Sequence, residues 1–280
     1  MEAQLTEPLA PPILVTGGTG TLGRLVVARL RAEGRAVRVL SRGAHKSNEI
    51  EFVRGDLSTG EGAEAAVAGV DIVIHCAGTA KGDGQKAAIL VRAASAAAVR
   101  HIVYISVVGA DRIPMAGAVD RTMFGYFGSK LAGEREIAES GIPWTTLRAT
   151  QFFDLSLKTV EAMAKLPVIP VPSGFRFQPV DAAEVADRLV ELALASPAGL
   201  APAIAGPHIY DMSDLVRGYL RAAGKRRMIA RMPIPGKAAA AIRDGANLAA
   251  DRAVGRHTWE DFLAARVAST RPSVPHSTRR

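Results

Sequence analysis

The chain has 280 residues, of which 48% are hydrophobic and 22% charged, and its formal net charge is +8. This composition supports a sizeable hydrophobic core and excludes a wholly disordered chain, and no apolar run reaches the roughly 18 residues of a membrane-spanning helix. The single cysteine, Cys76, excludes an internal disulfide. Together with the absence of a signal-peptide pattern in residues 1–12, it predicts a cytoplasmic protein. The scattered histidines predict no metal site.

Basic residues concentrate in the C-terminal part of the chain. From Arg217 to Arg280, 14 Lys and Arg stand against four Asp and Glu, a net charge of +10, whereas the first 216 residues carry −2. This segment could face an anion or a protein partner, or it could reflect only an Arg-rich and Ala-rich composition on solvated helices. We expect neither a nucleic-acid partner nor a membrane partner.

The first predicted elements frame a glycine-rich loop. Residues 1–12 read as a flexible lead-in, 13–15 as a buried strand and 21–33 as an amphipathic helix that ends at Gly34. A glycine-rich turn between a strand and a helix is typical of dinucleotide-binding proteins, because the helix N-terminus offers free N–H groups and a positive dipole end to phosphates. The alternative is a helix-entry turn with spare glycines.

Each glycine of this loop has its own physical reason. Gly17 lets the chain turn off the strand, Gly20 lets a pyrophosphate approach the backbone, and Gly23 lets the helix pack on the strand. Two spacings coexist, since Gly18, Gly20 and Gly23 fit G-x-G-x-x-G while Gly17, Gly20 and Gly23 fit G-x-x-G-x-x-G.

The second predicted strand, 36–40, ends in Ser41-Arg42-Gly43. An NAD site usually places an acidic residue here against the ribose 2′-hydroxyl, but this chain has Arg42. A guanidinium can bind a 2′-phosphate, which favours NADP(H) over NAD(H). Otherwise Arg42 is only a solvated cation.

The third and fourth strands supply further cofactor candidates. Residues 50–57 end in Asp56, which could accept a hydrogen bond from the adenine amino group, and Leu57, which could pack on the ring. After a helix at 61–68, strand 71–78 ends in small residues, Ala77 and Gly78, over which a cofactor can pass. We interpret Cys76 as a small buried hydrophobe and His75 as a core residue.

The second half of the predicted sheet carries the candidate chemistry. A helix at 84–98 precedes strand 101–108, an irregular stretch 109–123 leads into a helix that ends at Gly141, and strand 143–150 follows. Alternating strands and helices predict an α/β, doubly wound (Rossmann) parallel sheet. Tyr126 and Lys130 lie four residues apart and therefore on one helix face.

This pair suits proton transfer. An ammonium beside a phenol lowers the phenol pKa, so Tyr126 could exchange a proton with a carbonyl oxygen as hydride moves, while Lys130 donates to the nicotinamide ribose. The alternative is an aromatic packed on the sheet and a lysine on a solvated face.

Several motifs in this order resemble those of atypical, extended-type short-chain dehydrogenase/reductases of the NmrA-like, NAD(P)H-binding group. The resemblance covers roughly residues 13 to 195 and is carried by Thr16-Gly17-Gly18-Thr19-Gly20-Thr21-Leu22-Gly23, Gly55-Asp56-Leu57, Ile105-Ser106-Val107-Val108-Gly109-Ala110-Asp111, Tyr126-x-x-x-Lys130, Trp144-Thr145-Thr146-Leu147-Arg148-Ala149-Thr150-Gln151-Phe152 and Phe175-Arg176-Phe177-Gln178-Pro179-Val180-Asp181.

The resemblance implies a set of cofactor-binding residues, namely Gly17, Thr19, Gly20, Thr21, Leu22, Gly23, Arg42, Asp56, Leu57, Ala77, Gly78 and Lys130. In that family an active-site Ser or Thr follows the fifth strand, near Val108 in this chain. Ser106 lies two residues earlier on the same strand face and could partly substitute, which makes Tyr126, Lys130 and Ser106 the catalytic candidates.

The rest of the chain predicts a smaller, mostly helical lobe. We expect residues 13–150 to form the dinucleotide-binding core, 151–268 a substrate-side lobe packed on it, and 269–280 a disordered tail. Helices are expected at 182–195 and near 213–223, 236–250 and 258–267. Phe152, Phe153 and other apolar residues could line a pocket or form the lobe's own core.

Two functions are compatible with these residues. The first is an NADP(H)-dependent oxidoreductase acting on a small, largely apolar carbonyl- or quinone-like substrate, as a monomer or homodimer. The second is a non-catalytic NAD(P)-binding redox sensor of the NmrA type. The intact Tyr126/Lys130 pair favours the enzyme, whereas Val108 at the expected hydroxyl position favours the sensor.

Overall fold

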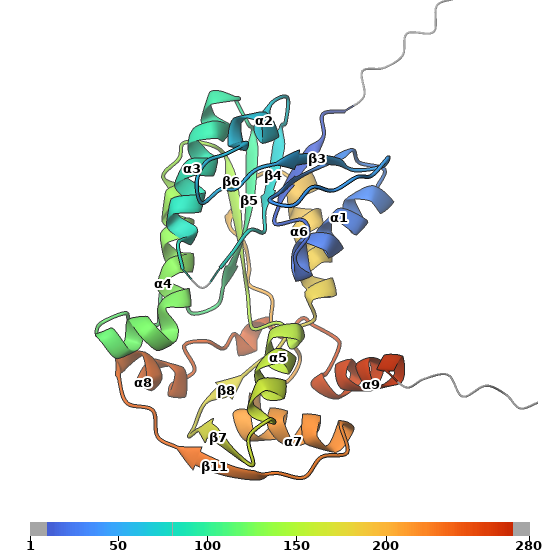
Figure 1. The fold of residues 1–280 in the computed structure, drawn as a ribbon. Helices are drawn as coiled ribbons and strands as arrows, with labels where there is room; N and C mark the ends of the chain where they lie inside the picture. Colours follow the sequence, from blue (N-terminus) through green and yellow to red (C-terminus); the bar gives the residue numbers. More distant parts are fainter. Residues whose placement is uncertain (1–9, 80, 271–280) are drawn as a thin grey trace, which may run out of the picture.

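A seven-stranded sheet forms the centre of the larger part of the molecule (Figure 1). The computed structural model describes residues 10–79 and 81–270. All strand pairs of the sheet are parallel, in the order β3-β2-β1-β4-β5-β6-β9. The strands are β1 (Ile13–Thr16), β2 (Val37–Ser41), β3 (Glu51–Arg54), β4 (Ile72–His75), β5 (His101–Val107), β6 (Trp144–Ala149) and β9 (Gly199–Leu200).

Helices cover both faces of this sheet. One face is covered by α1 (Thr21–Ala32) and α6 (Ala182–Leu194), and the other by α2 (Ala63–Val67), α3 (Asp83–Ala96) and α4 (Ala118–Ala138). Alternation along β1 explains the two layers, because Ile13 and Val15 pack with α1 and α6 while Leu14 packs with α2 and α3. The doubly wound parallel fold predicted from the sequence is confirmed.

Helix α4 begins earlier than the sequence predicts. It starts at Ala118, inside the stretch 109–123 that we expected to be irregular. The buried Asp120 explains the difference, because its carboxylate accepts the Gly117 N–H at 3.3 Å and the Ala238 N–H at 3.2 Å. Ala238 lies 118 residues away, so a tertiary contact stabilises this helix start.

The smaller lobe combines helices with two small sheets. Its elements are α5 (Phe153–Met163), α7 (Met212–Ala222), α8 (Lys237–Arg243), the 3₁₀ turn η1 (Ala250–Arg252), α9 (Trp259–Thr270), a parallel pair of β7 (Val168–Pro172) with β11 (Met228–Met232) and an antiparallel pair of β8 (Arg176–Phe177) with β10 (Tyr210–Asp211). The two sheets were not predicted. Phe153 packs against the fully buried Trp259, so it belongs to the lobe's own core.

Two helix boundaries of the lobe differ from prediction. The helix expected at 236–250 ends at Arg243, because the following Gly245 adopts φ +87° and turns the chain. Helix α9 runs to Thr270, two residues into the predicted tail. The remainder of that tail, and most of the predicted flexible lead-in 1–12, lie outside the described residues.

The predicted boundary at residue 151 does not separate the main sheet from the lobe, because later residues also belong to the sheet and its helical layer. Helix α6 packs on α1, and β9 pairs with β6 in the main sheet. Residues 182–200 therefore return from the lobe to complete the Rossmann layer, and the two parts share one continuous chain path (Figure 1).

One arginine joins three segments of the larger part. Arg148 on β6 donates from Nε and a terminal nitrogen to both carboxylate oxygens of Glu134, at 2.9 and 2.6 Å. Its other terminal nitrogen lies 2.8 Å from Asp111 Oδ2. The Arg148 guanidinium also lowers the pKa of Asp111 against the opposing effect of burial. This triad connects α4, β6 and the loop after β5, with Arg148 and Glu134 largely buried and Asp111 exposed.

We expect Arg148→Leu to lower the free energy of unfolding by about 2–4 kcal/mol, because it leaves the Glu134 carboxylate without its partner in a mostly buried position. Urea denaturation measures the change. Arg100→Leu is the control, since the exposed Arg100–Asp71 pair should contribute less than about 1 kcal/mol. Equal losses in the two variants would contradict this assignment.

Candidate functional site

An open cleft of about 710 Å³ lies at the carboxyl ends of β1, β2, β3 and β4. This is the place where open parallel sheets bind ligands. Eight of the twelve predicted cofactor-binding residues line it, namely Gly17, Thr19, Gly20, Arg42, Asp56, Leu57, Ala77 and Gly78. The cleft therefore brings together residues from the ends of four strands, each of which the sequence predicted separately as a cofactor-binding residue.

The glycine-rich loop is shaped by close backbone contacts. Gly17 adopts φ +69°, and a Cβ there would lie 2.7 Å from the Ala77 nitrogen. A Cβ on Gly23 would lie 2.1 Å from the Gly17 carbonyl oxygen. Gly18 instead packs on β2, where a Cβ would lie 2.8 Å from a methyl carbon of Val39. The turn thus depends on Gly17 and Gly23, while Gly20 borders the cleft.

The remaining loop candidates, Thr21 and Leu22, lie in the first turn of α1. The Leu22 side chain is buried in the core, so only its backbone can face a ligand. Together with Gly20 and Gly23, these residues present the N-terminal end of α1 toward the loop. That end carries the free N–H groups and positive dipole that a pyrophosphate requires.

The end of the cleft near β2 and β3 is cationic. Arg42 is exposed and lines the cleft without a hydrogen bond or ion pair to any described residue. Asp56 accepts the Ser58 N–H at 2.7 Å, and this bond lowers the pKa of its carboxyl group. Arg42 and Lys86 lower it further. Asp56 therefore stays ionised at neutral pH, and Arg42 and Lys86 line the same open cleft.

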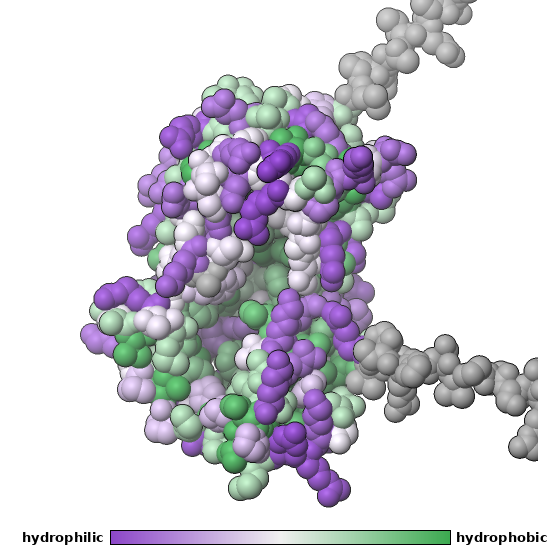
Figure 2. Space-filling model, in the orientation of Figure 1, coloured by the Kyte–Doolittle hydropathy of each residue, from purple (hydrophilic) through white to green (hydrophobic). Residues whose placement is uncertain are grey.

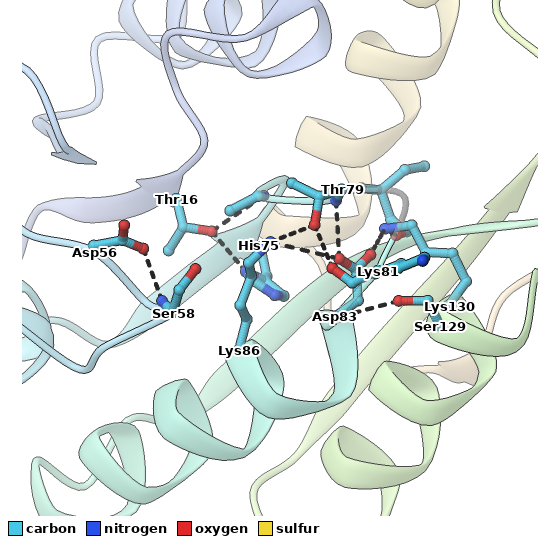
Figure 3. A network of polar contacts seen from close by, with 12 residues as sticks. Thr16, Asp56, Ser58, His75, Thr79, Lys81, Asp83, Lys86, Ser129 and Lys130 are labelled. Atoms are coloured by element: carbon cyan, nitrogen blue, oxygen red, sulfur yellow. Dashed lines mark hydrogen bonds and ion pairs between the residues drawn. The ribbon is translucent and has the colours of Figure 1, made fainter. Parts of the chain in front are cut away.

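Lys130 is almost fully buried next to the strand ends. It is 3% exposed, and its Nζ donates to the Ile105 carbonyl at 3.0 Å and lies 3.1 Å from Asp83 Oδ2 (Figure 3). A Cβ on Gly78 would lie 2.8 Å from this nitrogen, so the amine borders the Ala77–Gly78 strand end. Burial lowers the pKa of Lys130, and the Asp83 carboxylate opposes that shift.

Asp83 is a site residue that the sequence analysis missed. It is completely buried, and its Oδ1 accepts the Thr79 N–H at 2.9 Å while its own N–H donates to Ser129 Oγ at 3.0 Å. Lys86 Nζ lies 3.9 Å from the same carboxylate (Figure 3). The available signal was an acidic residue between two glycines at a helix start.

The neighbouring Gly84 shows why α3 brings Asp83 so close to α4. A Cβ on Gly84 would lie 2.9 Å from Ala132 Cβ, so the absence of a side chain permits the close approach of the two helices. This packing places the first residue of α3 next to Lys130 in the middle of α4.

The catalytic candidates Tyr126 and Ser106 are less tightly arranged. Tyr126 is 37% exposed, and its hydroxyl forms no hydrogen bond with a described residue. Partial burial and the Asp83 carboxylate raise the pKa of Tyr126 to about 12. The expectation that Lys130 lowers this pKa is therefore wrong, because the amine is turned to Asp83 and Ile105. Ser106 is buried, and its Oγ has no hydrogen-bond partner among the described residues.

His75 is a core residue, as predicted, whereas Cys76 is only half-buried and lines the cleft. His75 is fully buried, its Nδ1 lies 2.6 Å from Thr16 Oγ1, and burial lowers its pKa to about 3. Burial raises the pKa of Cys76 to about 12, so its thiol stays protonated at neutral pH. Within the described part of the chain, no cluster of three potential metal ligands occurs.

Comparison with known proteins identifies the family. A family model described as NAD(P)H-binding matches residues 17–206, which include the glycine-rich loop, the cleft and Lys130. This chain belongs to that NAD(P)H-binding family. The NAD(P)H-binding family predicted from the motifs is confirmed.

Several similar proteins are named reductases, whereas another is named a photosystem II assembly factor. The chain is 28% identical over 223 residues to the (4-alkanoyl-5-oxo-2,5-dihydrofuran-3-yl)methyl phosphate reductase of Streptomyces griseus, which covers 76% of this chain and 74% of that protein. It is 29% identical over 222 residues to the NAD(P)H azoreductase of Xenophilus azovorans, and this match again covers 76% of this chain and 74% of that protein. The prediction of an NAD(P)-dependent oxidoreductase agrees with these names.

A solved structure shares the fold along nearly the whole chain. The NADPH-dependent quinone oxidoreductase of Escherichia coli, in complex with NADPH, superposes with a TM-score of 0.76 at 19% identity, over 91% of this chain and 99% of that one. Across residues 10–79 and 81–270, no helix has the length and apolarity to cross a membrane.

Replacing Asp83 by Asn should lower the pKa of the Lys130 amine further, because burial then acts without the opposing carboxylate. A ¹³Cε NMR titration of the lysines measures it, with Lys130→Met identifying the resonance. Lys86→Met is the control and should raise the Lys130 pKa, because the Lys86 charge lowers it in the wild type. An unchanged Lys130 pKa in Asp83→Asn would contradict the assigned ion pair.

Proposed function

We propose that this protein is an NADP(H)-dependent oxidoreductase of the atypical short-chain dehydrogenase/reductase type, acting on a small, largely apolar carbonyl- or quinone-like substrate. The observation that carries the proposal is the buried Lys130–Asp83 pair beside the NAD(P)H cleft. A buried, oriented cation at the strand ends suits the nicotinamide end of a cofactor. The reductase names of the relatives support the same reaction class.

The cleft favours a cofactor with a 2′-phosphate. Arg42 occupies the position after β2 where an NAD site commonly has an acidic residue, and it is free of protein partners in the described chain. Lys86 adds a second cation to the same cleft. A guanidinium binds a phosphate through two parallel hydrogen bonds, so Arg42 is the residue expected to select NADPH over NADH.

Of the remaining candidates, Lys130 would bind the cofactor, and Tyr126 and Ser106 would serve proton transfer. The cofactor, when bound, supplies a hydride equivalent. Lys130 would donate to the nicotinamide ribose hydroxyls while Asp83 and the Ile105 carbonyl hold its Nζ in place. Tyr126, protonated at neutral pH because its pKa is raised to about 12, would give its proton to the substrate oxygen as hydride reaches the adjacent carbon. Ser106 Oγ would assist as a further donor.

The shape between the two parts supports an apolar substrate. Figure 2 shows a hollow between the Rossmann part and the lobe, bordered largely by green and pale residues. The cluster between α4 and α8 contains aromatic side chains, among them the half-buried Phe127 and Phe177, and we expect them to face this hollow. A small substrate that enters there would reach the strand ends from the lobe side.

A second function, a non-catalytic redox sensor, is favoured by two observations. Tyr126 is neither bonded to Lys130 nor acidified by it, and Val108 stands where the family's hydroxyl is expected. Such a protein would bind NAD(P)H and report its redox state to a partner without turnover. Either protein would work in the cytoplasm, as a monomer or homodimer.

Arg42→Ala should weaken NADPH binding about tenfold or more and leave NADH binding unchanged, because only NADPH carries the 2′-phosphate. Isothermal titration with both cofactors measures the two affinities. Arg54→Ala is the control, an exposed arginine at the end of β3 that does not line the cleft. A preference that survives Arg42→Ala would sink the 2′-phosphate assignment.

Tyr126→Phe should reduce kcat for NADPH oxidation by about 10²–10⁴ without changing the NADPH Kd, because it removes only the proton donor. A panel of carbonyl and quinone substrates provides the assay. Tyr219→Phe, a tyrosine of the lobe core, should leave both values unchanged. Cofactor binding without turnover on any substrate, insensitive to Tyr126→Phe, would favour the redox sensor.

A further inference from the structure

The small sheet of β7 and β11 has an apolar face that points away from the lobe core. The strands pair in parallel with Val168 opposite Met228, Pro170 opposite Ala230 and Pro172 opposite Met232. Because side chains alternate along a strand, these residues share one face, while Ile169 and Val171 face inward and are buried. Met228, Met232 and Val168 are 72%, 48% and 43% exposed.

A basic rim borders this face. No acidic residue occurs between Arg217 and Met232, a segment that contains Arg221, Lys225, Arg226, Arg227 and Arg231. Arg226, Arg227, Met228 and Lys165 together line a shallow depression of about 560 Å³ at the edge of the sheet. In the described chain, Lys225, Arg226 and Arg227 form no ion pair with a carboxylate. Figure 2 shows hydrophilic and hydrophobic residues side by side at this end of the molecule, where Figure 1 places β7 and β11.

We propose that this face, the outward side of β7 and β11 with its basic rim, binds an anionic lipid surface peripherally. Methionine and valine side chains would enter the interfacial region, and the Lys and Arg side chains would pair with lipid phosphates. Two other occupants fit less well. A second copy of the chain would bring two basic rims together, and a nucleic acid has no use for an exposed apolar sheet face.

This surface contains part of the basic segment 217–280 that the sequence marked as a possible anion-facing surface. Lipid contact was not expected because no segment can span a bilayer, but a peripheral face needs only a few exposed apolar side chains and several cations. The proposal does not depend on the oxidoreductase function, because the face is made of lobe residues and its binding can be measured without cofactor or substrate.

The test is sedimentation of the full chain with vesicles of phosphatidylcholine alone and of phosphatidylcholine with 30% phosphatidylglycerol. We expect binding only to the anionic vesicles, and at least tenfold weaker binding for Arg226→Glu/Arg227→Glu. Met228→Ser/Val168→Ser, which keeps every charge, should also weaken binding several-fold. The control Arg92→Glu/Arg135→Glu makes the same charge change on the exposed surfaces of α3 and α4 and should bind as the wild type does.

Four results would overturn the proposal. They are an absence of sedimentation with anionic vesicles, an equal loss in the Arg92/Arg135 control, tighter binding to a DNA duplex that Met228→Ser/Val168→Ser leaves unchanged, or a dimer in solution that the same variant dissociates. Unchanged circular dichroism and thermal melting confirm that each variant is folded, which is expected because every substituted side chain is exposed.

Discussion

The buried ion pair between Lys130 and Asp83 is the interaction on which the site depends. A lysine this deep would lose its proton or its position without a carboxylate at 3.1 Å. The pair also connects α3 to α4 across the carboxyl end of the sheet, with Thr79 and Ser129 binding the same aspartate. Structure and candidate chemistry are therefore coupled, because the contact that holds two helices also orients the only fully buried ammonium of the cleft region described.

The glycine-rich loop and the Lys130–Asp83 pair lie at successive points of the proposed cofactor path, which begins at Arg42. Gly17 and Gly23 shape a turn that no side chain would tolerate, and the α1 N-terminus follows it. Ala77 and Gly78 then lead along the end of β4 to the Lys130 amine. A dinucleotide needs this sequence of environments, in which an anion site, a smooth strand end and an oriented donor follow each other.

The lobe has two faces with different physical characters. One aromatic cluster, which includes Phe124 and Phe175, packs between α4 and α8 on the side toward the Rossmann part. On the outside, β7 and β11 leave an apolar surface edged by cations. Among the described residues of the basic segment 217–270, none lines the cofactor cleft. Arg226 and Arg227 lie instead beside the exposed hydrophobic residues of this face, and the combination suits an anionic lipid surface better than net charge alone would.

Local patterning of the sequence determined the doubly wound sheet, the glycine-rich loop and the residues that line the cleft, because apolar alternation and glycine position act over a few neighbouring residues. Only the tertiary structure decided the direction of the Lys130 amine. Asp83 is 47 residues earlier in the chain and reaches Lys130 only because Gly84 lets α3 approach α4. The same reason explains why Tyr126 was predicted to be acidified and is not, and why the β7–β11 sheet was missed. Pairings between distant segments leave no periodic trace in either segment, so they become visible only when the chain is folded.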